Sequence, residues 1–254
     1  MVFNDYVFVG IDPTTGRKDF AYAALDNELN LVALADADTE YMLDFLGGYD
    51  SAVAAVNAPS QVNRGLVKKK LEMGDLSHGR TYRGVDMRLV EYELRTRGIA
   101  VAGTPSRQDL CPAWMQVGFA FYRKLSRLGY KLYDSEDGTH QWLETHPYAC
   151  FCAMLEQVPF PKPTLEGRLQ RQIILHDKGL RITDPMDFFQ EITRFKLMKG
   201  ILPTEALYSP DQLDVLAAAY TAWLAVHRPD EVIRLGERSE GQMVLPVREL
   251  KEKY

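Results

Sequence analysis

The pattern of hydrophobic and polar positions predicts strands in the first part of the chain. Four apolar runs, each followed by turn residues, are typical of buried β-strands: residues 6–12, 19–25, 29–35 and 52–56. Residues 39–46 place apolar side chains at helical spacing and stop at Gly47-Gly48. Tight turns between the first three strands predict an antiparallel meander, and the helix before the fourth strand predicts a mixed sheet within an α/β layer.

The later part of the chain favours helices. We expect two helical pieces within residues 60–98, interrupted around Gly74–Gly84, and short strands at 99–101 and 142–145. Further helices are predicted at 113–128, 148–157, 164–178 and 185–198. Ser209-Pro210-Asp211-Gln212 has the pattern of a capping box with proline at the first helical position, which predicts a last helix to about His227. Residues 231–236 and 242–246 suggest a closing hairpin.

Composition is typical of a soluble globular protein, with 46% hydrophobic and 26% charged residues among 254. We expect one α/β domain over residues 1–254 with a helical insertion at about 60–98. No signal peptide or transmembrane stretch is visible. Three cysteines without a C-x-x-C pair favour a reducing, cytoplasmic location.

Charge is distributed unevenly along the chain. The net charge is −5, which argues against non-specific nucleic-acid binding by the whole surface. Residues 61–100 nevertheless hold nine Lys or Arg against five acids, a local charge of +4 that leaves −9 for the remainder. Such a basic face fits a phosphate backbone, although a solvated helix face explains the same pattern.

Acids placed against apolar surroundings are the candidate functional residues. Asp12 ends the first apolar strand, Glu144 lies within another, and Asp211 and Asp214 share one face of the last predicted helix. A buried acid is unfavourable unless a cation or hydrogen-bond donors meet it. Asp12 and Asp211 also suit a turn and a helix N-terminus, and Glu144 suits a pair with an arginine. Carboxylates gathered in this way are the ligands that Mg²⁺ and Mn²⁺ prefer.

The order of elements and acids resembles the ribonuclease H-like fold, and the Asp-x-x-Asp pair resembles that of RuvC-type resolvases. More closely, the chain resembles an uncharacterised family of predicted nucleases built on that fold. The resemblance rests on six segments: Val9-Gly10-Ile11-Asp12, Val56-Asn57-Ala58-Pro59, Glu144-Thr145-His146-Pro147, Gly167-Arg168-Leu169-Gln170-Arg171, residues 211–219 and residues 240–246. These segments span almost the whole chain in the family's order.

The resemblance implies a metal-dependent nuclease that hydrolyses phosphodiester bonds of DNA or RNA. Asp12, Glu144, Asp211 and Asp214 would be catalytic, and Asp12, Glu144 and Asp214 would hold Mg²⁺ or Mn²⁺ with Asn57. The family has an acid where this chain has Asn57. An asparagine can ligate a metal through its carbonyl oxygen but adds no charge, so the site suits one ion better than two.

Basic side chains would hold the substrate. The candidates are Arg83 and Arg88 in the insertion and Arg168 and Arg171 on a predicted helix, where two arginines three apart can grip a phosphate. Surface arginines that pack through their aliphatic stems are the alternative. His146 follows Glu144 and suits a general base, or a turn residue before proline.

Two other function classes compete with a nuclease. Asn57 and the acidic overall charge fit a catalytically impaired protein of the same fold that acts as a binding module. The segment Asp12-Pro13-Thr14-Thr15-Gly16 is similar to the phosphate-binding hairpin of actin-like ATPases and sugar kinases. Those proteins need a second, duplicated domain and a glycine-rich adenosine motif, which are not found in this sequence.

Overall fold

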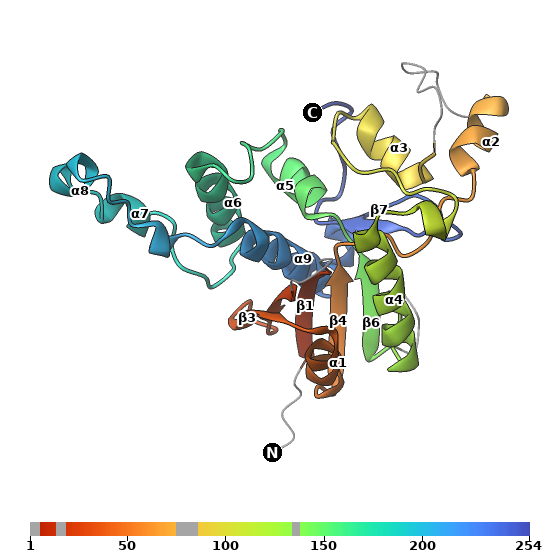
Figure 1. The fold of residues 1–254 in the computed structure, drawn as a ribbon, viewed down its shortest axis with the longest axis horizontal. Coiled ribbons are helices and arrows are strands. Elements are labelled where there is room, and N and C mark those ends of the chain that lie inside the picture. The colour runs from red at the N-terminus through yellow and green to blue at the C-terminus, as the bar shows by residue number, and fades with distance from the viewer. Residues whose placement is uncertain (1–5, 14–18, 75–85, 134–137) are drawn as a thin grey trace.

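A computed structural model of the protein describes residues 6–13, 19–74, 86–133 and 138–254 (Figure 1). Within these residues, eight strands form one mixed sheet. The strands are β1 (Tyr6–Asp12), β2 (Phe20–Leu25), β3 (Leu31–Ala37), β4 (Ser51–Val56), β5 (Lys131–Leu132), β6 (His140–Glu144), β7 (Ile233–Leu235) and β8 (Met243–Leu245). The predicted meander, the fourth strand and the closing hairpin are confirmed.

The strand order is β3-β2-β1-β4-β6-β8-β7, with β5 also beside β6. β1, β2 and β3 pair antiparallel, whereas β4 and β6 run parallel to β1. The carboxyl ends of β1, β4 and β6 therefore meet at one edge of the sheet. Ligands of open α/β sheets generally bind outside such an edge.

The helices are α1 (Thr39–Gly47), α2 (Leu66–Glu72), α3 (Leu89–Thr96), α4 (Ala113–Arg127), α5 (Pro147–Leu155), α6 (Leu165–Asp177), α7 (Asp187–Gln190), α8 (Arg194–Met198) and α9 (Pro210–His227). The predicted capping box opens α9, where the Ser209 hydroxyl accepts from the backbone N–H of Gln212. None of the helices in the described ranges combines the length and the apolar character needed to cross a bilayer.

Two local predictions were wrong. Residues 185–198 form two short helices instead of one, because Thr193 takes an extended conformation and caps α8 by accepting from the backbone N–H of Lys196. Residues 99–101 belong to no strand. In the insertion, α2 and α3 supply the two expected helical pieces, while most of the interruption, residues 75–85, lies outside the described part of the chain.

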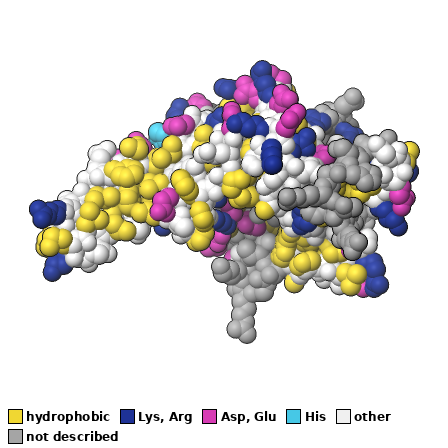
Figure 2. All heavy atoms as spheres, turned by 90° about the horizontal axis from the view of Figure 1, so that it is seen from above, with side chains coloured by type: hydrophobic (Ala, Val, Ile, Leu, Met, Phe, Trp, Pro, Cys, Tyr) yellow, Lys and Arg dark blue, Asp and Glu magenta, His cyan; other side chains and the backbone are white. Residues whose placement is uncertain are grey.

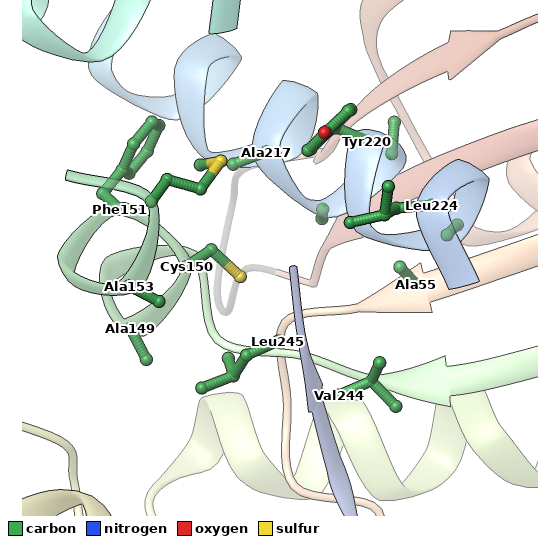
Figure 3. Close-up of a cluster of buried hydrophobic side chains, with 14 of the residues drawn as sticks. Ala55, Ala149, Cys150, Phe151, Ala153, Ala217, Tyr220, Leu224, Val244 and Leu245 are labelled. Carbon is green, nitrogen blue, oxygen red and sulfur yellow. The ribbon is translucent and has the colours of Figure 1, made fainter. Parts of the chain in front are cut away.

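Helices cover both faces of the sheet. Side chains alternate along β1, so Phe8 packs in one core with α5 and α9, while Val7, Val9 and Ile11 pack in another with α1 and α4. In the first core, Ala217 and Leu224 of α9 lie near Cys150 and Phe151 of α5 and the β8 side chains (Figure 3). The cysteines at 111, 150 and 152 are all free and buried.

Gly10 determines how closely α9 approaches the sheet. A Cβ atom built on Gly10 would lie 1.9 Å from the carbonyl oxygen of Val215 and 2.4 Å from the amide nitrogen of Ala219. Any larger residue would therefore push the helix away from β1. Because Asp214 directly precedes Val215, this close contact places Asp214 beside the carboxyl end of β1, where Asp12 lies.

The segment with α7 and α8 extends away from the sheet as an arm (Figure 1). Large hydrophobic side chains are exposed along it, including Phe189, Phe195 and Met198. Figure 2 shows hydrophobic side chains gathered on this arm, with basic side chains at its tip. The arm contributes none of the candidate site residues described below.

Candidate functional site

The ends of three parallel strands bring the first site residues together. In the ladder, Ile11 of β1 pairs with Val56 of β4, and Val56 pairs with Glu144 of β6. The backbone continues in register beyond the strands, since the N–H of Asn57 donates to the carbonyl oxygen of Ile11 at 2.8 Å. Asp12 and Asn57 therefore lie side by side at the edge of the sheet.

Asp12 and Asp214 form a pair of neighbouring carboxyl groups at this edge. Burial, and next to it the charge of Asp214, raises the pKa of Asp12 to about 7, although a hydrogen bond with the side chain of Asn57 acts in the opposite direction. Burial also raises the pKa of Asp214, which is only 8% exposed. Two carboxylates in such an environment are costly to ionise together unless a cation lies between them.

Lys162 supplies a cation to the outer side of this pair. Its Nζ lies 2.6 Å from Oδ2 of Asp214 and 3.0 Å from Oδ1 of Asp211, which is exposed. Burial alone would lower the pKa of Lys162, but the two aspartates outweigh it and raise the pKa, so the ammonium group stays charged. Sequence analysis did not single out Lys162, because it lies in a proline-rich connector between α5 and α6 without a periodic pattern.

Glu144 is held in an ion pair of its own. Arg88 donates from Nη2 to Oε1 of Glu144 at 2.5 Å and from Nη1 to Oε2 at 2.9 Å, and the backbone N–H of Ser60 donates to Oε2 at 2.7 Å. Both side chains are about 1% exposed. Sequence analysis gave two readings of Glu144, a metal ligand or the partner of an arginine, and the structure shows the second. Arg88, expected to contact phosphate, is that partner.

Arg88 also joins a second buried acid. Its Nε donates to Oε1 of Glu91 at 2.8 Å, and Glu91 further accepts from the backbone N–H and the hydroxyl of Thr104. The carboxylates hold the pKa of Arg88 above its ordinary value despite burial, so the guanidinium remains charged. This network fixes the helical insertion to the end of β6.

The other predicted phosphate contacts are bound to the protein itself. Arg168 donates to the backbone carbonyl oxygens of Leu207 and Tyr208, and Arg171 donates to those of Phe160 and Gly167. Arg171 is also buried, with its guanidinium carbon 5.2 Å from the ring centre of Phe151. In the structure both arginines support loops around α6. Arg83, the fourth candidate, lies outside the described residues.

A cavity of about 460 Å³ opens next to the acid pair, at the carboxyl ends of the parallel strands. Among its lining residues are Asp12, Asn57, Thr104, Trp114, Glu144 and His146. The cavity is large enough for a small organic ligand. Trp114 and Thr104 were missed by sequence analysis, because helical periodicity assigns Trp114 to the core and nothing distinguishes Thr104.

His146 is positioned as a neutral donor at this cavity. It caps α5, since its Nδ1 accepts from the backbone N–H of Ala149 at 3.3 Å, so the proton of the neutral ring lies on Nε2. Burial is the main reason that the pKa of His146 falls to about 4. At neutral pH the imidazole is therefore uncharged.

The oxygen atoms at this edge of the sheet are suitable ligands for one divalent cation. Mg²⁺ in proteins is usually held by one or two carboxylates and keeps several waters, a set that Asp12, Asp214 and the amide oxygen of Asn57 can supply. The described ranges contain no group of three His, Cys, Asp or Glu side chains arranged to hold a metal ion.

Because the pKa of Asp12 is raised in the folded protein, the free energy of unfolding should depend on pH. The folded protein retains the Asp12 proton up to about pH 7, whereas the unfolded chain releases it near pH 3.8, so ionisation of Asp12 destabilises the fold as pH rises between these values. His146 has the opposite effect on stability. Burial lowers its pKa in the folded protein to about 4, so between pH 6.5 and 4 the unfolded chain takes up a proton that the folded protein does not, and the fold loses stability as pH falls. Comparing a variant with the wild type isolates the contribution of Asp12.

We expect the free energy of unfolding of Asp12→Asn, relative to wild type, to rise with pH from about 4 to 7 and then to level off. The difference can rise by at most about 1.4 kcal/mol per pH unit, the value for one proton. Urea unfolding at several pH values measures it, with the exposed Asp36→Asn as the matched control. A difference that does not change with pH would contradict the buried environment assigned to Asp12.

Comparison with known proteins identifies a family without assigning an activity. The sequence pattern of a family described as a protein of unknown function (DUF429) matches residues 10–240. No curated protein and no solved structure matches the chain. Because the family match extends over most of the chain, including Asp12, Asn57, Lys162 and Asp214, the chain belongs to the DUF429 family of proteins of unknown function.

Proposed function

We propose that the protein is a divalent-cation-dependent hydrolase of phosphodiester bonds in nucleic acid. The observation that supports this most directly is the pair of buried carboxyl groups, Asp12 from the end of β1 and Asp214 from α9. The raised pKa of Asp12 reports that burial and Asp214 disfavour its ionised form. A bound cation would reverse that penalty and keep both groups ionised.

The architecture around the pair supports the same proposal. An antiparallel meander, a helix, a strand parallel to β1 and a late helix with Asp211 and Asp214 follow in the order on which the ribonuclease H-like resemblance rests. The strand order β3-β2-β1-β4-β6 places Asp12 centrally, between the meander and the parallel strands. We therefore propose a ribonuclease H-like fold.

Each residue of the site has a distinct role in this proposal. Asp12 and Asp214 would hold Mg²⁺ or Mn²⁺, with Asn57 adding a neutral oxygen ligand. The ion would supply a polarised water and charge for the leaving oxygen. Lys162 would neutralise Asp211 and the outer oxygen of Asp214, which limits the negative charge that an incoming phosphate meets. Arg88 and Glu144 would support the wall of the site without contacting phosphate.

A second candidate is a binding module with the same fold and no catalysis. The specific observation in its favour is Lys162, whose ammonium group already compensates Asp214 at 2.6 Å. Asn57 removes one further negative charge from the edge of the sheet. In this alternative an internal cation replaces the metal ion, and the protein recognises a partner without turnover.

Restoring an acid at position 57 distinguishes the two candidates. We expect Asn57→Asp to raise metal affinity about tenfold or more and to increase cation-dependent cleavage of labelled DNA or RNA. Asn27→Asp, at an exposed turn, adds the same charge away from the site and should have no effect. Cleavage should be measured with Mg²⁺, Mn²⁺ and EDTA on single- and double-stranded substrates.

The outcomes separate cleanly. Cation-dependent cleavage by the wild type that Asn57→Asp strengthens supports the hydrolase. Activity that appears only in Asn57→Asp supports the binding module, in which Asn57 has disabled the site. If neither protein cleaves any substrate, the hydrolase proposal is contradicted.

A further inference from the structure

The cavity beside the acid pair is larger than phosphodiester chemistry requires. Asp12 and Asn57 line it together with residues from β6, the insertion and the first turn of α4. Its volume of about 460 Å³ exceeds what a metal ion with its waters occupies. The chemistry of its walls indicates what else it accommodates.

Much of the wall is apolar, and one side of it is aromatic. Trp114 lines the cavity beside Met115, and Pro59 and Val101 add further apolar surface. Trp114 is half-buried, packed against the small cluster of Cys111, Met115 and Phe119. An indole held in this way, with part of its surface still open, is a suitable stacking surface for a flat ring.

The charges around the cavity disfavour an anionic ligand. Among the described residues that line it, one is cationic, Arg88, and three are acids: Asp12, Glu91 and Glu144. Arg88 is about 1% exposed and already donates to Glu91 and Glu144. In the described part of the lining, a phosphate or carboxylate deep in the cavity would therefore meet three acids and a cation that is already paired, whereas a neutral ring would carry no negative charge toward those acids.

In the described lining, two neutral polar residues and one carboxyl group have hydrogen-bonding capacity left for recognising a ligand. The hydroxyl of Thr104 donates to Glu91, and the hydroxyl of Thr145 donates to the carbonyl oxygen of Val244. The Asn57 amide already hydrogen-bonds Asp12, which leaves its second N–H and its carbonyl oxygen for a ligand. His146 offers its Nε2–H because Nδ1 accepts the hydrogen bond that caps α5. With Asp12 as an acceptor, these groups match a ring whose edge has both donors and acceptors.

We propose that this cavity binds a nucleobase, stacked on Trp114 and recognised at its polar edge by Asn57 and His146. The inference rests on the proposed function for the identity of its natural ligand, a base of the nucleic acid whose backbone lies at the acid pair. A base inside a duplex is stacked and paired and cannot enter a pocket without being extruded. The protein would therefore act on single-stranded or unpaired nucleic acid.

Binding of uncharged nucleosides tests the cavity without any catalysis. The probes are adenosine, guanosine, cytidine, uridine and thymidine, titrated calorimetrically into the full-length protein with EDTA present. We expect at least one nucleoside to bind, and Trp114→Leu to weaken its binding about tenfold, as for loss of one base–aromatic stack. Trp114→Phe should retain most of the affinity. Phe160→Leu, an exposed aromatic outside the cavity, should leave it unchanged.

A second variant keeps the test valid if Trp114→Leu does not fold. Ala102 lines the cavity yet is exposed, so Ala102→Phe should fill space in the cavity without disturbing the core. We expect it to abolish nucleoside binding. The proposal is overturned if no nucleoside binds the wild type at millimolar concentration, or if Ala102→Phe and Trp114→Leu bind as the wild type does.

Two further arms identify the source of the base and separate this inference from the proposed function. Single-stranded oligonucleotides that bind more tightly than nucleosides support a base of a polynucleotide, whereas a blunt duplex that binds equally well contradicts it. Tighter binding of the free nucleoside would support the cavity as a base site but would overturn the polynucleotide as its source. Nucleoside binding without cation-dependent cleavage would leave the base site standing and contradict the hydrolase.

Discussion

Replacing Asp12 and Asp214 together by asparagine is expected to abolish cation-stimulated cleavage of nucleic acid. Both carboxylates are proposed to hold the ion, and a bound ion contributes several kcal/mol of transition-state stabilisation, about two orders of magnitude or more in rate. The double variant should cleave no faster with Mg²⁺ or Mn²⁺ than with EDTA. Single variants should each lose most of the stimulation, because the described residues offer the ion no third carboxylate at this point.

Loss of activity in this double variant is informative only if its fold is intact. Asparagine has nearly the same shape as aspartate, and it removes two buried groups whose ionisation the surroundings disfavour. Lys162 loses Asp214 but keeps its ion pair with Asp211 at 3.0 Å, so we expect the double variant to remain folded at neutral pH without metal. The matched control is Asp36→Asn, an exposed residue of β3. Cleavage that remains cation-dependent in the double variant would contradict the site.

Replacing Arg88 by methionine is expected to destabilise the protein by about 3–5 kcal/mol, the cost of removing one partner from a buried ion pair. The substitution would leave Glu144 and Glu91 buried without their guanidinium partner. It would also detach the amino end of α3 from the end of β6, since Arg88 directly precedes α3. Urea unfolding measures the loss as a lower midpoint.

Two comparisons make this prediction specific. Arg107→Met removes an arginine whose ion pair with Asp109 is exposed, and it should change stability by less than about 1 kcal/mol. Combining Arg88→Met with Glu91→Gln and Glu144→Gln removes the unpaired charges and should recover part of the loss. If Arg88→Met and Arg107→Met are equally stable, the buried network does not hold the insertion in place.

Much of the fold followed from local sequence patterns. The first four strands, the helix between the third and the fourth, and α9 with its capping box depend on alternation, turn residues and caps within a few positions. The placement of Asp12 beside Asp214 was predicted from an acid at a strand end, a helix that presents Asp214, and the resemblance to a known order of elements. Gly10 gives this placement a physical basis, through the close contact of β1 and α9.

What the sequence did not reveal depends on long-range contacts. An arginine partner for Glu144 was one of two readings, but Arg88 lies 56 positions away and no sequence pattern identified it as that partner. Lys162 reaches Asp211 and Asp214 from a connector, about 50 positions earlier in the chain. Arg168 and Arg171 had the spacing of a phosphate grip, but their donors are used by backbone carbonyl groups of neighbouring segments.

Asp12 and Asp214 are proposed to form a site for one divalent cation. The most direct measurement is the thermal unfolding midpoint of the wild type and of Asp12→Asn, each with and without millimolar Mg²⁺ or Mn²⁺. A cation that binds the folded state at a hundredfold excess over its Kd stabilises it by about 2.7 kcal/mol. We predict a higher midpoint with metal in the wild type and no change in Asp12→Asn. No rise in the wild type, or an equal rise in both proteins, would contradict the site.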